Sequence, residues 1–285
     1  MSFGSIADTV NIRGNVTTPR YVFGTGGINV VEPIHQALDA GYRAFDTAQQ
    51  YGNEEVVGRA LKEYKIDRKD VFVITKVNKP GETVEATLEG IRESVQKLDL
   101  AYVDLFLIHN PNYGPEGRKI QWKALEQAKK EGLARAIGVS NFVLHHLEGM
   151  KEYATELPAV NQTELTMFYQ DKEVVEWCNQ HGVQMQSFAP VARAQKKDDE
   201  SLLQVAKEVE RPWNRVMLRW NWQKGYLVTC KSEKADRIRD NTSIFDFELS
   251  SAQMEKLDAL DCGFKVTPST VKDVDERSRY YKDMP

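Results

Sequence analysis

Short apolar runs recur along the chain and alternate with longer segments in which charged residues are frequent. Several runs lack the alternation of a strand with one solvent-facing side, and continuous apolar character is typical of strands buried on both faces of a parallel sheet. The pattern predicts eight strands, at residues 21–24, 43–46, 71–76, 103–108, 136–139, 158–161, 184–188 and 226–229.

The segments between the runs repeat apolar residues every three or four positions, which is the spacing of a helix with one buried face. Residues 54–64 and 84–98 show this spacing clearly, and residues 32–38 also fit a helix because Pro33 is tolerated in a first turn. Glycines that suit the left-handed residue at a helix end follow three helical stretches, at Gly41, Gly132 and Gly182.

Strands that alternate with helices predict a (β/α)8 barrel, with an open doubly wound sheet as the alternative. No linker or shift in composition divides the 285 residues, so we expect a single domain over residues 1–285. In such barrels the catalytic groups gather where strands end and the following loops begin. The strand ends are therefore the places to search for a site.

The composition is that of an ordinary globular protein, with 41% hydrophobic residues, 28% charged residues and a net charge of −4. No cluster of Lys and Arg predicts a nucleic-acid or membrane partner, and no segment approaches the roughly 18 apolar residues of a membrane span. The N-terminus lacks the pattern of a signal peptide, and the three cysteines are irregularly spaced, as expected of reduced thiols. We expect a cytoplasmic protein that is monomeric or weakly associating.

Three ionisable residues stand at the ends of consecutive predicted strands, namely Asp46, Lys76 and His109, and Tyr51 follows in the loop after the first. A buried lysine needs a partner, which Asp46 can supply. A lysine beside a phenol stabilises the phenolate, so the tyrosine can act as a general acid, and His109 can orient a carbonyl oxygen. The alternative is a surface tyrosine near a structural ion pair.

A series of motifs spans nearly the whole chain: GYRAFDTAQQYGNEEVVGRAL, VFVITKV, VDLFLIHNP, AIGVSNF, NQTEL, SFAPV, CKSEKADRIRDN and FELSSAQMEKLDAL. Together they resemble the aldo-keto reductases. The resemblance implies an NAD(P)H-dependent carbonyl reductase on a (β/α)8 barrel, without metal or flavin. It also implies a catalytic tetrad of Asp46, Tyr51, Lys76 and His109, with Tyr51 as the proton donor.

The same resemblance implies a set of cofactor contacts. Near the nicotinamide these are Thr25, Asp46, Ser140, Asn141, Gln162 and Phe188, the last where the family usually has tyrosine. At the adenosine end they are Lys231, Ser232 and Arg237 around a ribose 2′-phosphate, and Asp240 and Asn241 near adenine. A guanidinium suits a phosphate, so we expect NADPH to be preferred over NADH, although Glu233 and Asp236 add negative charge nearby. Taken alone, these residues would also suit helix caps and a charged surface.

Two positions depart from the family pattern. Gly26 stands where a bulky aromatic residue is usual, and Asn110 stands where an aromatic residue usually follows the histidine. We expect both to widen the substrate pocket and make it more polar, which favours a carbonyl substrate such as a sugar, keto acid or ketoester. Residues 262–285 form a polar tail that either folds across the pocket mouth or lies on the barrel. Cys178 and His181 have the spacing of a metal-binding pair but lack a second pair, so no metal site is expected.

Two other functions remain open from the sequence. A nicotinamide-binding regulatory subunit would keep the fold and the cofactor with little turnover, but the intact tetrad argues against it. A barrel enzyme that uses Lys76 as a Schiff-base nucleophile would leave the motifs from Ser140 to Asn241 unexplained.

Overall fold

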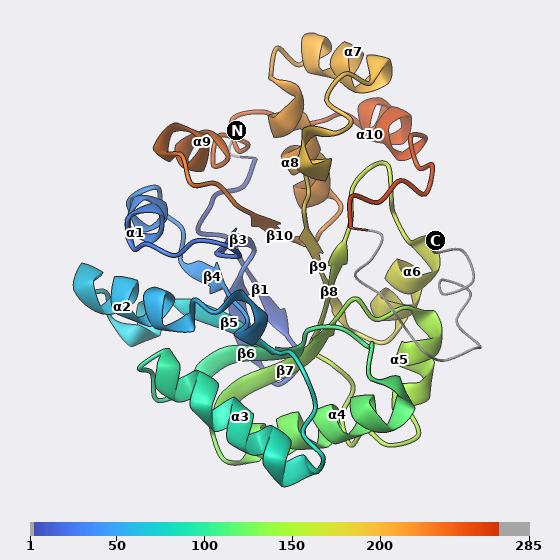
Figure 1. Cartoon of the computed structure of the whole chain (residues 1–285). Helices are drawn as coiled ribbons and strands as arrows, with labels where there is room; N and C mark the ends of the chain where they lie inside the picture. The colour runs from blue at the N-terminus through green and yellow to red at the C-terminus, as the bar shows by residue number, and fades with distance from the viewer. Residues whose placement is uncertain (1–2, 268–285) are drawn as a thin grey trace.

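A computed structural model describes residues 3–267 of the chain. Its centre is a closed barrel of parallel strands in the order β10-β3-β4-β5-β6-β7-β8-β9 (Figure 1). The strands are β3 (Tyr21–Gly24), β4 (Ala44–Asp46), β5 (Phe72–Val77), β6 (Val103–Ile108), β7 (Ala134–Ser140), β8 (Val160–Glu164), β9 (Gln184–Phe188) and β10 (Leu227–Cys230). The predicted (β/α)8 barrel is confirmed and the open sheet is excluded, because β10 pairs in parallel with both β9 and β3.

All eight predicted strands are present, with small changes at their ends. β8 starts at Val160 rather than at Pro158, because proline has no N–H to donate to a neighbouring strand. β7 starts two residues earlier than predicted, because Ala134 still pairs with Val103 of β6. Every residue of β5 and β6 is buried, which explains why their sequences show no alternation.

Helices surround the barrel and cover its outer face (Figure 1). They are α1 (Glu32–Asp39), α2 (Glu54–Tyr64), α3 (Val84–Lys97), α4 (Gly114–Lys130), α5 (Leu144–Met150), α6 (Lys172–Gln180), α7 (Glu200–Glu208), α8 (Trp213–Gln223), α9 (Ala235–Asp240) and α10 (Ser251–Asp258). The three helices predicted from periodicity coincide with α1, α2 and α3. The chain approaches itself closely between α2 and the end of α3, where a Cβ at Gly58 would lie 2.1 Å from the carbonyl oxygen of Leu98.

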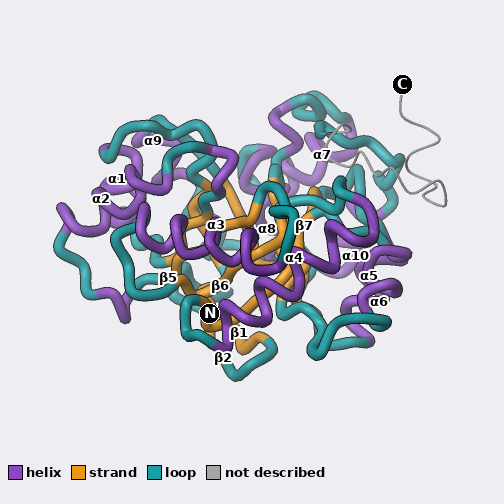
Figure 2. The backbone as a smooth tube through the Cα atoms, turned by 60° about the horizontal axis from the view of Figure 1, so that its bottom comes forward, coloured by secondary structure: helices purple, strands orange, loops and turns teal. Residues whose placement is uncertain are grey.

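An antiparallel hairpin of β1 (Thr9–Ile12) and β2 (Val16–Pro19) lies at the end of the barrel where the strands begin (Figure 2). Ile12 and Val16 pack in one apolar cluster with barrel residues that include Val22, Ala44 and Leu227. The hairpin therefore closes this end and leaves the opposite end for a site. The hairpin was not among the predicted strands, because each of its strands has only four residues and is partly exposed.

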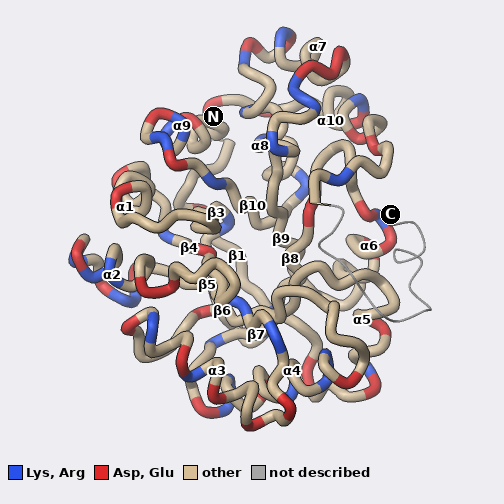
Figure 3. Tube along the Cα trace, viewed as in Figure 1, with Lys and Arg blue, Asp and Glu red and all other residues tan. Residues whose placement is uncertain are grey.

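Positive and negative residues are mixed over the outer helices rather than gathered by sign (Figure 3). No helix within residues 3–267 is long and apolar enough to cross a membrane. The single domain expected over residues 1–285 stays a prediction, and the part of the expected tail beyond residue 267 lies outside the described residues.

Candidate active site

A cavity of about 790 Å³ opens at the ends of the barrel strands. Most residues that the sequence analysis assigned to a site lie on its wall: Gly26, Asp46, Tyr51, His109, Asn110, Ser140, Asn141, Gln162, Phe188, Lys231 and Asn241. Lys76 lies behind this wall and is fully buried. Thr25, Ser232, Arg237 and Asp240 are not among the lining residues.

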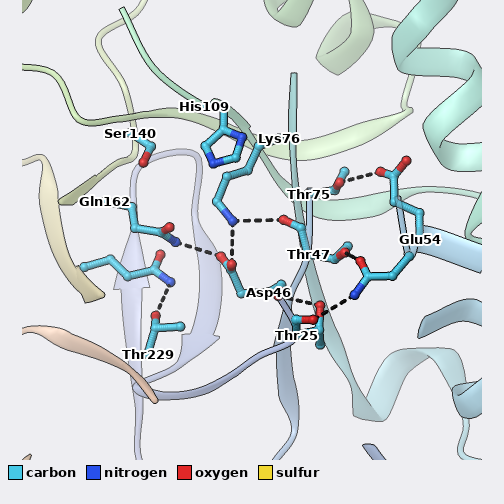
Figure 4. Close-up of polar contacts among 12 residues, drawn as sticks. Thr25, Asp46, Thr47, Glu54, Thr75, Lys76, His109, Ser140, Gln162 and Thr229 are labelled. Atoms are coloured by element: carbon cyan, nitrogen blue, oxygen red, sulfur yellow. Dashed lines mark hydrogen bonds and ion pairs between the residues drawn. The ribbon is translucent and has the colours of Figure 1, made fainter. Parts of the chain in front are cut away.

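The centre of the site is an ion pair between the last residue of β4 and the fifth residue of β5. Lys76 Nζ donates hydrogen bonds to Asp46 Oδ1 and to the carbonyl oxygen of Thr47 (2.9 Å), as Figure 4 shows. Burial alone lowers the pKa of the Lys76 ammonium, but Asp46 and Tyr51 together outweigh burial and raise this pKa above its ordinary value. Lys76 therefore keeps a positive charge in an apolar barrel.

The second oxygen of Asp46 connects opposite sides of the barrel. Gln162 Nε2, at the end of β8, donates to Asp46 Oδ2 over 2.7 Å (Figure 4). Thr25 supports Asp46 from behind, since its buried hydroxyl donates to the Asp46 carbonyl oxygen (2.9 Å). Asp46 is thus held through both its backbone and its carboxylate. Thr25 does not line the cavity, and its hydroxyl instead positions Asp46.

Tyr51 ends a 3-10 turn, Gln49–Tyr51, rather than the irregular loop expected from the sequence. Gly52 closes the turn with a left-handed φ of 65°, a conformation that glycine adopts without strain. Lys76 Nζ lies 5.2 Å from the centroid of the Tyr51 ring, and the His109 ring lies edge-on to it at 5.5 Å between centroids. The four residues expected to form the tetrad are therefore together in one place.

The imidazole of His109 is neutral at physiological pH. Burial, assisted by the positive charge of Lys76, lowers the pKa of His109 to about 3. Its backbone is fixed at both ends, because its N–H donates to Val77 and its carbonyl oxygen accepts from Asn141 Nδ2 (3.0 Å). A neutral imidazole donates from only one ring nitrogen, so His109 can offer one hydrogen bond to a ligand oxygen.

Polar groups suited to an amide ligand line the same cavity as Tyr51 and His109. Ser140 ends β7, and Asn141 follows with a left-handed φ of 62°. Asn141 Oδ1 is buried and has no hydrogen-bond partner among the described residues. A buried acceptor without a partner is unfavourable, so this atom suits the N–H of a bound carboxamide. Phe188, at the end of β9, adds an aromatic face to the same cavity.

The residues expected at the adenosine end extend from the end of β10 to the C-terminal end of α9. Lys231 and Asn241 line the cavity, whereas Arg237 is exposed and does not line it. Lys231 Nζ forms an ion pair with Glu233 (3.0 Å). The Asp240 carboxylate accepts hydrogen bonds from Arg215 Nε (2.9 Å) and from Asn214, so it is already occupied within the protein.

Sequence reasoning missed a connection between β8 and the C-terminal segment. Glu164 is fully buried, and its carboxylate accepts hydrogen bonds from the backbone N–H groups of Val266 (2.7 Å) and Thr267 (3.0 Å) and from the Thr267 hydroxyl. This connection brings Thr267 to the cavity wall. Glu164 and Thr267 are 103 positions apart, so no local pattern could have paired them.

A second missed residue is Arg193, which lines the cavity from a turn after β9. The motif SFAPV directed attention to Phe188 and the next two residues, Ala189 and Pro190, but not as far as Arg193. Within residues 3–267, no group of three or more His, Cys, Asp or Glu residues is arranged to hold a metal ion. Cys178 is buried, and the His181 ring stacks on Trp177 at 4.0 Å between centroids.

Comparison with known proteins agrees with this geometry. The sequence profile of the Aldo/keto reductase family matches residues 28–261. The chain belongs to this family. A glyoxal reductase of Bacillus subtilis (strain 168) is 39% identical over 269 residues, which cover 93% of this chain and 97% of the relative. As a member of the family, the chain is an NAD(P)H-dependent oxidoreductase.

Solved structures of other aldo/keto reductases have the same architecture. An enzyme from Brucella melitensis is 32% identical with a TM-score of 0.85, covering 90% of this chain and 100% of its own. A Bombyx mori aldo-keto reductase in complex with NADP is 27% identical with a TM-score of 0.85, covering 99% of both chains. The aldo/keto reductase described here thus shares its barrel with a protein that binds this nucleotide.

Proposed function

We propose that this aldo/keto reductase reduces an aldehyde or ketone to an alcohol, with Tyr51 as the general acid. One observation carries the proposal: Tyr51, His109 and the buried Asp46–Lys76 ion pair meet at one wall of the cavity. Bound NADPH would supply the hydride. The remaining tasks are to bind the carbonyl group, to orient it and to protonate its oxygen, and they belong to the side chains of this chain.

The arrangement suits proton transfer to a carbonyl oxygen. Tyr51 donates the proton, and the nearby Lys76 ammonium stabilises the phenolate that remains. Asp46 and the Thr47 carbonyl oxygen keep Lys76 charged and in place. His109, neutral because of its pKa of about 3, donates a hydrogen bond that orients the same oxygen. Because the Asp46–Lys76 ion pair and the backbone of His109 are held in place before substrate arrives, little rearrangement accompanies the reaction.

The cofactor assignment follows the polar groups along the cavity. Ser140, Asn141 and Gln162 would bind the carboxamide of the nicotinamide, whose ring would stack on Phe188. At the other end, Lys231, Ser232 and Arg237 would bind the 2′-phosphate, with Asp240 and Asn241 beside the adenine. Two observations support this placement, namely the unpaired Asn141 Oδ1 and the position of Lys231 on the cavity wall. We therefore propose NADPH as the preferred cofactor.

The substrate side of the cavity favours a carbonyl compound with a second oxygen. Asn110 Oδ1 accepts a hydrogen bond from the backbone N–H of Asn112 (3.2 Å), which leaves the Asn110 amide N–H groups as donors. Gly26 leaves open the space beside the Tyr51 ring, since a Cβ there would lie 3.4 Å from it. The relative from Bacillus subtilis is a glyoxal reductase. We propose that this chain likewise reduces small dicarbonyl and hydroxylated carbonyl compounds.

The test is NADPH oxidation with a panel of aldehydes and ketones, repeated with NADH and with Tyr51→Phe. Turnover that falls by about 100-fold or more in the variant, while NADPH still binds, would support Tyr51 as the acid. Tight NADPH binding without turnover in the wild type would favour the regulatory alternative instead.

The Schiff-base alternative has less support, because Lys76 Nζ is fully buried and bonded to two acceptors. We also propose a cytoplasmic monomer, in keeping with the composition and three unpaired cysteines.

A further inference from the structure

The turn that carries Tyr51 is tied to its surroundings through the side chain of Gln49. Gln49 Oε1 accepts a hydrogen bond from the backbone N–H of Asn78 (2.9 Å). Gln49 Nε2 donates to the carbonyl oxygen of Gly90 (3.0 Å) and to Ser94 Oγ (3.0 Å), both on α3. One amide thus joins the turn to the end of β5 and to a surrounding helix.

Within residues 3–267, the backbone of the turn makes only local hydrogen bonds. Tyr51 N–H donates to the carbonyl oxygen of Ala48, and Gly52 N–H donates to that of Gln49. These bonds close the turn but do not determine its distance from the neighbouring strand. The contacts of Gln49 help to do so, because Asn78 stands two residues after Lys76 at the same strand end. Just before the turn, Thr47 adds a backbone bond from its N–H to the Ile74 carbonyl oxygen (2.8 Å) and accepts one from Lys76 Nζ.

We propose that Gln49 is a positioning residue for Tyr51, which holds the phenol at a constant distance from Lys76 and His109. This inference rests on the proposed function, since a proton donor must exist to be positioned. Gln49 itself is not on the cavity wall, so it acts through Tyr51 and not by touching a ligand. A purely structural role is the alternative, in which its three hydrogen bonds only stabilise the fold.

The two roles predict different kinetics. Misplacement of a reacting group by about 1 Å can reduce a rate by about 100-fold. We expect a smaller movement when Gln49 is replaced, because Thr47 before the turn and Asn53 after it stay joined by a side-chain hydrogen bond (2.7 Å). The expected loss in kcat is therefore about tenfold, with the dissociation constant of NADPH unchanged.

The test compares Gln49→Met with Gln180→Met, a matched control. Both changes replace a glutamine by an apolar side chain of similar length, but Gln180 is exposed at the end of α6. A third variant, Ser94→Ala, removes one of the three partners of Gln49 and should lower kcat about twofold. For each we would measure kcat, KM for the carbonyl substrate, NADPH affinity and the midpoint of urea unfolding.

A double-mutant cycle with Tyr51→Phe decides between the roles. If Gln49 acts through Tyr51, Gln49→Met will cause no further loss of the residual activity of Tyr51→Phe. An equal tenfold loss in both backgrounds, or an unchanged kcat in Gln49→Met, would overturn the inference while leaving the proposed function intact. A wild type that reduces no carbonyl compound would refute the proposed function and this inference with it.

Discussion

Replacing Asp46 by asparagine should leave the Lys76 ammonium buried without its counter-ion. Asp46→Asn keeps the size of the side chain but removes its negative charge. The Lys76 side chain is 0% exposed and that of Asp46 is 4% exposed, so water has little access to the ammonium to compensate for the lost partner. Removal of one member of a buried ion pair typically destabilises a protein by about 3–5 kcal/mol.

The loss of stability in Asp46→Asn has an upper limit, and this limit depends on pH. Lys76 can lose its proton instead of remaining charged, and for an amine with a pKa of about 10.4 this costs about 5 kcal/mol at pH 7 and about 2 kcal/mol at pH 9. In the variant the folded state then binds one proton fewer than the unfolded state. Its stability should therefore rise by about 1.4 kcal/mol per pH unit relative to the wild type, in which Lys76 is charged in both states.

The assay is urea unfolding of both proteins at several values between pH 7 and pH 9, followed by tryptophan fluorescence. The control is the double variant Asp46→Asn with Lys76→Met, which removes the titrating amine. Its stability should follow the wild-type pH dependence and exceed that of Asp46→Asn at pH 7. A loss below about 1 kcal/mol at pH 7, or a difference that does not change with pH, would refute the reasoning.

Three further predictions concern other parts of the molecule. Because burial and a nearby positive charge lower the pKa of His109 to about 3, its contribution to stability is complete above about pH 6.5 and lost as the pH falls towards 3. His109→Gln should therefore show an unfolding free energy that depends less on pH in this window, by about 1.4 kcal/mol per unit, and identical slopes would contradict the prediction. Glu233→Gln should release Lys231 from its ion pair and raise the ratio of kcat/KM for NADPH to that for NADH severalfold, whereas a lower ratio would show that Lys231 does not bind the phosphate. Gly58→Ala should destabilise the protein by about 3 kcal/mol or prevent folding, because a Cβ has no room there, while Gly149→Ala, with no atom within 4 Å, should be neutral or stabilising in the same unfolding assay.

Much of the fold could be predicted because parallel barrel strands have a simple signature. β5 and β6 are buried at every position, so their sequences are apolar throughout, and the helices between strands show one apolar face. The β1–β2 hairpin has no such signature, since its strands are short and packed on one side only. Its position depends on the barrel that it closes.

The site was predictable to the extent that position along a strand determines position in the barrel. Asp46 and His109 stand at strand ends, so their meeting followed from the alternation of strands and helices. The hydrogen bonds that hold these residues in place were not predictable. Gln49 bonds with residues 29 to 45 positions away, and its glutamine side chain looks like any polar loop residue. Side-chain contacts between distant segments leave no periodic pattern in a sequence.

The hydrogen bond between Asp46 and Gln162 has a consequence for biosynthesis. All four proposed proton-transfer residues have been translated once the ribosome passes His109, yet Asp46 lacks its second partner until Gln162 emerges. β3 acquires its other neighbour only when β10, the last of the eight barrel strands along the chain, has emerged. Between the translation of His109 and that of β10, a nascent chain therefore carries the reactive side chains without the cavity that would allow them to consume reducing equivalents.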